Sequence, residues 1–310
     1  MIEEALDRVS IARLRHDLFH LCREPLPFRK ANYTRPGQSV HSLAEADAFI
    51  CGQLEAAGYR PTRTQCRVQA FRCDPTRPLH HWYSPPEPGD PVFAVANLEA
   101  VRTGSERPEQ IVQLIAHKDS MSWIDSPGAH DNGTGTVALL EVARALAACR
   151  LRRSVRLLFC NEEHTPWTSR VAAAAAAERG DRLAAVLNVD GLDGKSDEDM
   201  AAGRLLQAIG YSTDEGRGLA EFAAACAARH TPELNVTVFF KERVNDDDGM
   251  FINEGFRTTI MNTGSWPYGD SEYHLPGDVP ERVDLENLRQ STRMLVATIL
   301  EIDRAESLPF

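Results

Sequence analysis

Hydrophobic and polar positions follow a helical period at the start of the chain. Apolar side chains in residues 2–21 recur about every three to four positions, which predicts an amphipathic helix. A second helix is expected to begin at a cap on Ser39 or Ser42 and to run to Ala57. Gly58 then stands where a left-handed residue commonly ends a helix. The chain therefore opens on helices.

Beyond an irregular loop at 72–91, short apolar runs alternate with longer amphipathic segments. This alternation predicts an α/β fold, with a mixed, mostly parallel β-sheet sandwiched by helices. We expect one domain, residues 1–310, with an N-terminal helical segment 1–57 and an excursion between the strands near 190 and 235. The strands are expected near 92–98, 110–116, 154–160, 184–189, 235–240 and 257–262, and the helices near 134–149, 169–180, 214–229 and 283–303.

Composition and charge narrow the functional classes. The 310 residues are 43% hydrophobic and 25% charged, which excludes disorder as the main state. The net charge of −11 should repel nucleic acid, and no run of Lys and Arg offers a phosphate-binding surface. A surplus of carboxylates suits a site that concentrates cations, but an ordinary soluble surface explains it more simply.

Cysteine usage and the chain start bear on the compartment. The seven cysteines are odd in number and show no Cys-x-x-Cys spacing, so we expect neither a disulfide framework nor a structural zinc knuckle. No signal peptide is visible, and no stretch approaches the roughly 18 apolar residues of a membrane span. The sequence predicts a cytoplasmic protein.

A histidine and an aspartate follow the apolar run 111–115. His117 and Asp119 are two positions apart, so on an extended segment their side chains point the same way. Asp119 can then accept a hydrogen bond from one nitrogen of His117 and leave the other free for a metal.

Other predicted strands also end at polar side chains that suit a metal. The ends of neighbouring strands meet at one edge of a sheet, where ligands bind. Nitrogen and oxygen donors of this kind suit zinc, and two ions would need roughly five or six protein ligands. The candidate ligands are His117, Asp131, Glu163, Asp190 and His274, with Asp131 shared between the ions. Glu162 then remains beside a ligand, where a general base should stand.

Each residue also has a simpler interpretation. The pair Glu162–Glu163 taken alone would be solvated surface, Asp131 would belong to a turn, and His274 would be an ordinary loop histidine. His80 and His81 are expected to be solvated loop histidines rather than ligands. The joint occurrence of the other residues at successive strand ends favours a metal site.

Five short motifs occur in the order of a known enzyme family. They are Ala-His-Lys-Asp-Ser at 116–120, Pro-Gly-Ala-His-Asp-Asn-Gly-Thr-Gly at 127–135, Phe-Cys-Asn-Glu-Glu at 159–163, Leu-Asn-Val-Asp at 187–190 and Tyr-His-Leu-Pro-Gly-Asp at 273–278. With them the chain resembles the M28 family of co-catalytic zinc peptidases. That family includes bacterial leucyl aminopeptidases and, more distantly, glutaminyl cyclases. The resemblance runs from about residue 35 to 303 and implies the fold of zinc exopeptidases, which is phosphorylase/hydrolase-like.

The resemblance implies the same ligand set. One Zn²⁺ would be held by His117 and Asp190 and a second by Glu163 and His274, with Asp131 bridging them.

It also implies the roles of the neighbouring residues. Glu162 would activate a metal-bridging water as general base and then act as general acid, while Asp119 would orient His117. Family members often have a cis peptide after the bridging aspartate, here Asp131–Asn132.

The chain departs from the family pattern at three places. Residues 164–169 replace a glycine-containing stretch that leads to Gly-Ser, so the substrate preference is open. The segment Asp246–Asp248 replaces Ser-Asp-His, with Asp247 keeping the central carboxylate. His130 stands where the family often has Asp or Asn, and we expect it at most to support the ligands indirectly.

Three functions follow from these patterns. The favoured one is a dinuclear zinc aminopeptidase that removes N-terminal residues from a peptide or another small amide. The alternatives are a glutaminyl-peptide cyclotransferase and a non-catalytic M28-like domain. No nucleic-acid or membrane partner is expected, and the oligomeric state stays open. The aromatic side chains expected near the substrate are Trp123, Trp167, Trp266 and Tyr268.

Overall fold

The computed structural model describes residues 2–265, 269–308 and 310, and its centre is one mixed β-sheet. The sheet order is β10-β9-β11-β8-β5-β6-β4-β1-β7. The strand bounds in that order are Asn235–Phe240, Leu206–Tyr211, Thr259–Thr263, Arg182–Val189, Arg107–His117, Arg153–Cys160, Phe93–Arg102, Thr62–Ala70 and His164–Thr165. A separate small hairpin pairs β2 (Arg72–Cys73) with β3 (Tyr83–Ser84).

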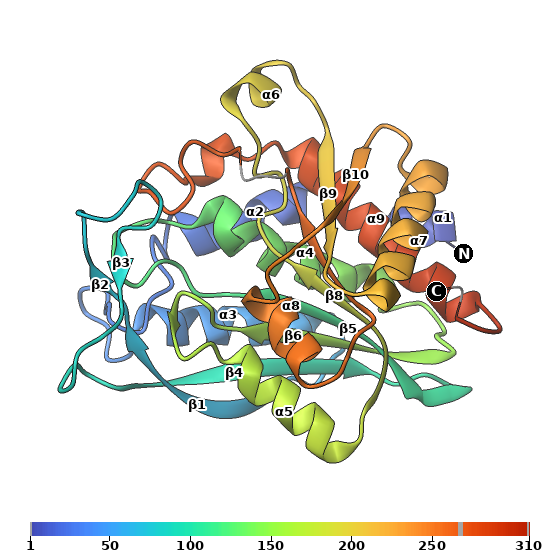
Figure 1. Cartoon of the computed structure of the whole chain (residues 1–310), viewed down its shortest axis with the longest axis horizontal. Helices are drawn as coiled ribbons and strands as arrows, with labels where there is room; N and C mark the ends of the chain where they lie inside the picture. Colours follow the sequence, from blue (N-terminus) through green and yellow to red (C-terminus); the bar gives the residue numbers. More distant parts are fainter. Residues whose placement is uncertain (1, 266–268, 309) are drawn as a thin grey trace.

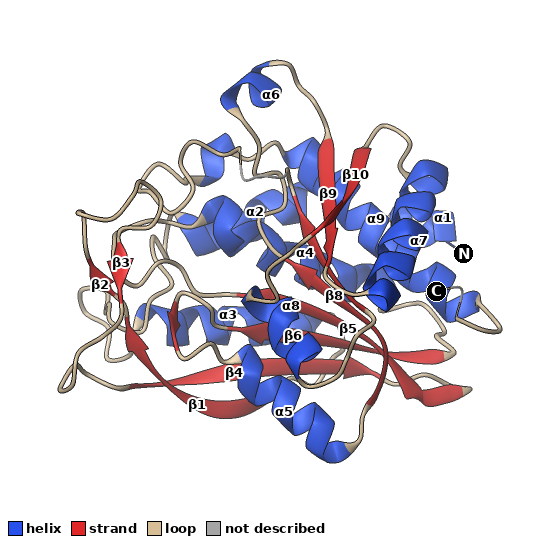
Figure 2. Cartoon of the chain, in the orientation of Figure 1, coloured by secondary structure: helices blue, strands red, loops and turns tan. Residues whose placement is uncertain are grey.

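Helices cover both faces of this sheet (Figures 1 and 2). One face carries α1 (Ile2–Leu6), α2 (Ile11–Cys22), α3 (Ser42–Ala56), α4 (Thr134–Leu146), α7 (Asp214–His230) and α9 (Leu285–Arg304). The other face carries α5 (Ser169–Arg179) and α8 (Asp246–Asn253). Successive residues of β5 divide between the two cores, because Leu114 packs in the first and Ile115 in the second. The α/β fold with a mixed sheet between helices is confirmed.

Parallel pairing at the sheet centre positions the candidate site. The strands β11, β8, β5 and β6 are neighbours and run parallel. His117, the last residue of β5, stands opposite Cys160, the last residue of β6. The carboxyl ends of these strands therefore meet at one edge, and the loops that follow them carry the candidate ligands.

The N-terminal helices differ from the expected pattern. Residues 2–21 form two helices, not one, because the chain turns at Asp7–Val9 and Ser10 caps α2 by accepting a hydrogen bond from the backbone of Arg13. The cap of α3 is neither Ser39 nor Ser42: it is His41, whose ring nitrogen accepts the backbone N–H of Ala44 at 3.0 Å.

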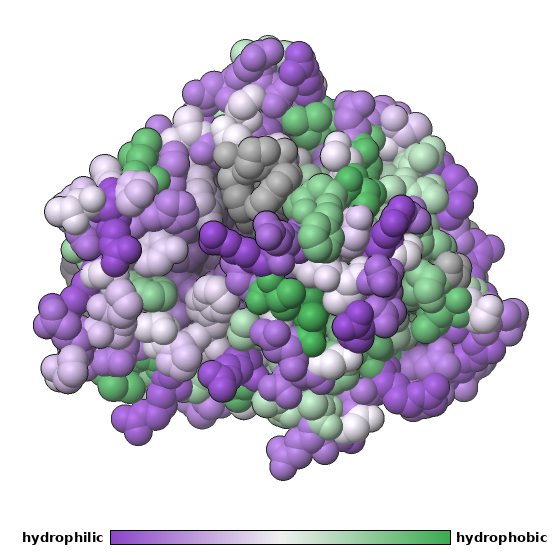
Figure 3. All heavy atoms as spheres, viewed as in Figure 1, coloured by the Kyte–Doolittle hydropathy of each residue, from purple (hydrophilic) through white to green (hydrophobic). Residues whose placement is uncertain are grey.

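Further elements were absent from the expected pattern. The strand β1 is missing from it because its solvent-facing side is polar. The expected excursion contains α6 (Asp197–Ala201) but also β9, which belongs to the sheet. The expected loop 72–91 contains β2 and β3. The face shown in Figure 3 is mostly hydrophilic. Among the described helices, none is both long and apolar enough to span a bilayer.

Candidate active site

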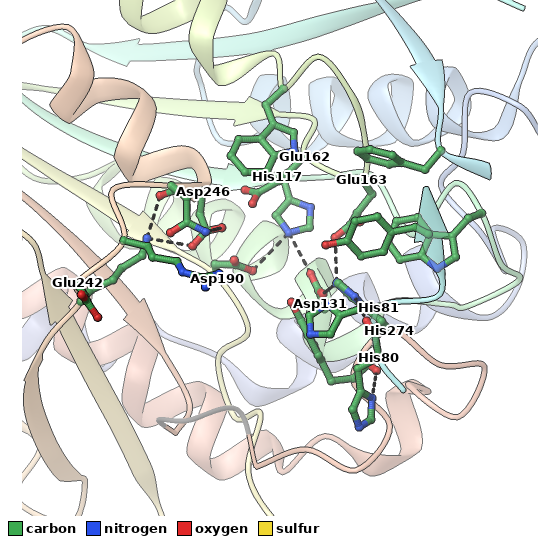
Figure 4. Close-up of a pocket in the computed structure, with 18 residues that line it drawn as sticks. His80, His81, His117, Asp131, Glu162, Glu163, Asp190, Glu242, Asp246 and His274 are labelled. Atoms are coloured by element: carbon green, nitrogen blue, oxygen red, sulfur yellow. Dashed lines mark hydrogen bonds and ion pairs between the residues drawn. The ribbon is translucent and has the colours of Figure 1, made fainter. Parts of the chain in front are cut away.

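A cavity of about 630 Å³ lies where the parallel strands end. Its wall combines buried carboxylates and histidines with aromatic rings and a charged loop (Figure 4). The lining residues are Phe71, His80, His81, Tyr83, His117, Trp123, Asp131, Glu162, Glu163, Trp167, Asp190, Lys241, Glu242, Arg243, Asn245, Asp246, Tyr273 and His274. All candidate ligands from the sequence therefore meet in one cavity.

Asp131 lies between two histidines from different loops. Its Oδ1 is 3.0 Å from Nε2 of His117, and its Oδ2 is 3.1 Å from Nε2 of His274. The same histidine nitrogens face a second carboxylate each, since Nε2 of His117 is 3.3 Å from Asp190 Oδ1 and Nε2 of His274 is 3.6 Å from Glu163 Oε1. Figure 4 shows His117 between Asp190 and Asp131. We call these five residues the ligand cluster.

The donor atoms of the ligand cluster fit a metal ion. His117, Asp131 and Glu163 offer three ligand atoms within 4.8 Å of one another, and so do His117, Glu162 and Asp190. Asp190 Oδ1 is buried, and its contact among the described residues is the same Nε2 of His117 that also faces Asp131. A single imidazole N–H cannot serve two facing carboxylates, whereas a divalent cation between them can. Imidazole and carboxylate are the donors that zinc accepts.

Negative charge in the ligand cluster perturbs its titration. Burial, reinforced by the nearby Asp131 carboxylate, raises the pKa of Glu163 to about 7. Burial lowers the pKa of His274, but the carboxylates of Glu163 and Asp131 outweigh it and raise that pKa to about 10. In the part of the chain that the structure describes, no Lys or Arg forms an ion pair with these carboxylates. The site therefore carries more negative charge than its own side chains balance.

Glu162 has one carboxylate oxygen available to the cavity. Its Oε2 accepts the backbone N–H of Asp247 at 3.2 Å, and Oε1 has no partner within the described chain. Burial, with the negative charge of Asp247 and Asp246, raises the pKa of Glu162 well above its ordinary value. The Asp247 carboxylate in turn accepts from Cys160 Sγ at 2.9 Å. Such a carboxyl has the environment of a proton acceptor.

Asp119 is buried beneath the ligand cluster and holds the backbone of Glu162 and Glu163. Its Oδ1 accepts the backbone N–H of Glu162, and its Oδ2 accepts that of Glu163, both at 2.9 Å. Its Oδ1 is also 3.4 Å from Nδ1 of His117, the ring nitrogen that faces away from Asp131. A second histidine, His164, contacts Asp119 Oδ2 at 2.8 Å.

The hairpin at residues 72–84 reaches His274 of the ligand cluster, a contact that sequence reasoning missed. His274 Nδ1 lies 2.6 Å from the backbone oxygen of His80, and His80 Nδ1 lies 2.6 Å from the backbone oxygen of Tyr273. The first bond leaves Nε2 of His274 facing the carboxylates. Among the described residues, neither His80 nor His81 belongs to a group of possible metal ligands. The expectation of solvated loop histidines nevertheless misses the role of His80 against His274.

The departure at Asp246–Asp248 has a structural explanation. Lys241, which is buried, contacts Asp246 at 2.9 Å and both oxygens of Asp248 at 2.9 Å. It also donates to the backbone oxygen of Asn245 at 2.9 Å. Asp248 thus pairs with a buried cation that closes the loop along one wall of the cavity.

His130 belongs to a second buried group beside the ligand cluster. Its Nδ1 is 3.0 Å from Asp270 and 3.3 Å from Asp278, and its Nε2 is 3.4 Å from Asp193. We call these four residues the His130 cluster. Asp278 also accepts the backbone N–H groups of His130 and Asp131, so it fixes the chain next to the bridging candidate.

Two details of the expected site can be placed directly. The Asp131–Asn132 peptide is cis, as the family resemblance implied. Trp123 and Trp167 line the cavity as expected, while Trp266 and Tyr268 lie outside the described residues.

The sequence of the chain matches a known family model. The model of peptidase family M28 matches residues 97–299, which span β4 through most of α9. The chain belongs to peptidase family M28. All ligand-cluster residues fall within the matched region of this M28 chain.

Curated relatives of this M28 chain carry peptidase names. A probable zinc metalloprotease of Leptosphaeria maculans is 25% identical over 254 residues, which cover 69% of this chain and 59% of that protein. Aminopeptidase YwaD of Bacillus subtilis is 26% identical over 212 residues, covering 64% of this chain and 42% of that protein. The chain thus spans about half the length of these relatives.

Solved structures share the fold. LapB of Legionella pneumophila matches 98% of this chain and 75% of its own at a TM-score of 0.74 and 19% identity. A glutaminyl cyclase of Bacteroides thetaiotaomicron matches 94% of this chain and 97% of its own at 0.70 and 14% identity. The M28 fold therefore extends over the N-terminal helices, outside the region matched by the family model.

Proposed function

We propose that this M28 chain is a zinc-dependent aminopeptidase. The observation that carries the proposal is the Asp131 carboxylate held between two histidines, with the free Oε1 of Glu162 in the same cavity. The names of curated relatives, among them an aminopeptidase of Bacillus subtilis, support the same activity. We extend the proposal to residues 1–310 as one domain. The cytoplasmic location expected from the sequence stays a prediction.

The proposed ligands follow the distances in the structure. His117 and Asp190 would hold one zinc ion and Glu163 and His274 a second, with Asp131 shared between them. When bound, zinc supplies Lewis acidity that polarises the scissile carbonyl and makes water a stronger acid. The excess negative charge of the cavity is then balanced by the ions.

Glu162 would carry the proton in the reaction. Its Oε1 accepts a proton from the attacking water and returns it to the nitrogen of the leaving amine, so that one water is consumed for each peptide bond cleaved. The backbone N–H of Asp247 keeps Oε2 in place during both transfers. The free amine of the substrate is cationic, and Glu242, which lines the cavity outside the ligand cluster, offers it a carboxylate that a blocked N-terminus would not use.

Substitution of the proton acceptor tests this proposal. Glu162→Gln keeps the size of the side chain but cannot accept the proton. We expect turnover of aminoacyl p-nitroanilides to fall by about 10²- to 10⁴-fold while zinc content is unchanged. Zinc content is measured by mass spectrometry of the purified protein. Glu178→Gln, an exposed change on α5 outside the cavity, is the matched control and should leave both quantities unchanged.

The same assays separate the alternative functions. Equal cleavage of N-acetylated and free peptides would contradict an aminopeptidase. Ammonia release from a glutamine-initiated peptide without cleavage would identify a glutaminyl-peptide cyclotransferase. A wild-type chain that binds no zinc and turns over none of these substrates would be a non-catalytic member of the family.

A further inference from the structure

His164 follows the glutamate pair directly and is fully buried. Its Nδ1 lies 2.8 Å from Asp119 Oδ2, on the carboxylate that also faces His117. Its Nε2 lies 3.1 Å from the backbone nitrogen of Ala31. The imidazole thus joins two segments that are far apart in the sequence.

The two contacts determine the tautomer of His164. A backbone N–H can only donate, so Nε2 of His164 accepts the hydrogen bond from Ala31 and carries no proton. The ring proton is then on Nδ1, where it is donated to Asp119. A ring with both contacts satisfied cannot rotate without losing them, so its orientation is defined from two sides.

The segment at residues 29–31 is itself fixed to the loop that carries Asp119. Arg29 N donates to Ser120 Oγ at 3.0 Å, Ser120 N donates to Arg29 O at 2.9 Å, and Arg29 Nε donates to Lys118 O at 2.8 Å. The backbone of His164 is held separately, because β7 pairs with β1 at Ala70. The side chain of His164 is therefore placed between two anchored segments.

We propose that His164 is a positioning residue that orients Asp119 and, through it, the zinc ligand His117. The inference rests on the proposed zinc site. A histidine that binds a metal through Nε2 carries its proton on Nδ1, and Asp119 Oδ1 faces that nitrogen. The backbone N–H groups of Glu162 and Glu163 hold one oxygen each, and His164 adds a side-chain donor to Oδ2, which keeps Oδ1 directed at His117. Ala31, which supports His164, lies outside the region matched by the family model.

Three substitutions separate the two contacts of His164. In His164→Asn the amide N–H can occupy the position of Nδ1 and still donate to Asp119, while the acceptor for Ala31 is lost. In His164→Gln the longer side chain can offer an oxygen near the position of Nε2, so the bond from Ala31 is kept and the donor to Asp119 is lost. His164→Ala removes both.

Zinc affinity, measured by competition with a chromogenic chelator, is the main readout. We expect His164→Gln and His164→Ala to bind the more weakly held zinc ion about tenfold less tightly. This is the lower end of the loss in metal affinity found when partners of metal-binding histidines are removed. We expect the zinc affinity of His164→Asn to stay within about threefold of wild type. Thermal unfolding of the metal-free proteins checks that each variant folds. His230→Gln on α7, whose ring contacts Glu3 and Glu301 outside the cavity, is the matched control.

The outcomes distinguish this inference from the proposed function. A wild-type protein that binds no zinc overturns the proposed function. Folded Gln and Ala variants with wild-type zinc affinity overturn the role of His164. A loss of zinc affinity that is equal in all three variants and follows their melting temperatures overturns it too. Nitrogen-15 spectra of histidine-labelled protein give a second test if the Ala variant does not fold: a proton on Nε2 of His164 contradicts the inference.

Discussion

Two buried groups of histidine and carboxylate lie side by side in this chain, and their charges are balanced differently. The His130 cluster includes three aspartates, and two cations from elsewhere in the chain reach it: Lys195 is 2.8 Å from Asp193, and Arg282 is 3.2 Å from Asp270. The ligand cluster also contains three carboxylates, with Glu162 beside them. Within the described residues, neither Lys nor Arg pairs with any of these four.

The difference distinguishes an ion-pair network from the proposed metal site. A buried carboxylate is stable only with a compensating partner. In the His130 cluster the protein supplies that partner from its own side chains, with Lys195 and Arg282 adding to the histidine. In the ligand cluster the compensation is incomplete, and the cavity leaves it accessible to an ion from outside. Three close donors alone do not indicate a metal, because both groups offer them.

The largest effect is expected from loss of the bridging carboxylate. Asp131→Ala removes a side chain that faces both histidines, so both zinc ions should be affected. We expect zinc affinity to fall by more than the roughly 10- to 100-fold that follows when a residue hydrogen-bonded to a metal ligand is substituted. Turnover should be lost as well. Chelator competition and a peptidase assay measure the two quantities. Retention of two tightly bound zinc ions would refute the bridging role.

The second prediction concerns the His130 cluster. Lys195→Met leaves the buried Asp193 without its closest cation, and no other Lys or Arg of the described chain contacts Asp193. The substitution also removes the contacts of Lys195 Nζ with Asp284 and Asn287. The free energy of unfolding should fall by about 3–5 kcal/mol while zinc stoichiometry stays unchanged. Urea unfolding of metal-free protein measures the first quantity.

The exposed pair between Arg217 and Glu221 on α7 gives a control for this variant. Arg217→Met should change the free energy of unfolding far less than Lys195→Met, because solvent screens an exposed pair. If Lys195→Met instead released zinc with little change in stability, the distinction between the two clusters would be wrong.

The smallest effect is expected from removing a single zinc ion. Each ion at about 100 times its dissociation constant should add about 2.7 kcal/mol to the free energy of unfolding, because it binds the folded chain. Scanning calorimetry with and without a chelator measures this increment. Lys195→Met should keep the increment and Asp131→Ala should lose it. An increment that also disappears in Lys195→Met would mean that the clusters are one unit.

The sequence predicted those parts of the fold and site that depend on local patterns. Leu114 and Ile115 lie in an apolar run that indicates a buried strand, and the residues after such runs meet because parallel strands end together. Strand β1 and helix α8 were missed for the opposite reason. The first has mostly polar residues, and the second begins with three aspartates and contains Gly249, which has low helix propensity.

The contacts around the ligands could not be predicted because they join distant segments. His164 and Ala31 are 133 positions apart, and His80 and His274 are 194 apart. No periodicity or spacing connects such pairs. The unusual residues themselves were a signal, since both His164 and Asp248 stand where the chain departs from the family pattern. Only the structure shows that their partners are Asp119 and Lys241.

The bond between the hairpin at 72–84 and His274 uses a main-chain oxygen, and this has a consequence for how the site can diversify. The hairpin contributes Tyr83 and His81 to the cavity, yet the atom that orients His274 is the backbone oxygen of His80. Hairpin side chains other than that of His80, whose ring contacts the backbone oxygen of Tyr273, can therefore change, by natural drift or by engineering, while the orientation of His274 is retained. This wall of the cavity is thus free to evolve separately from the ligand cluster beneath it.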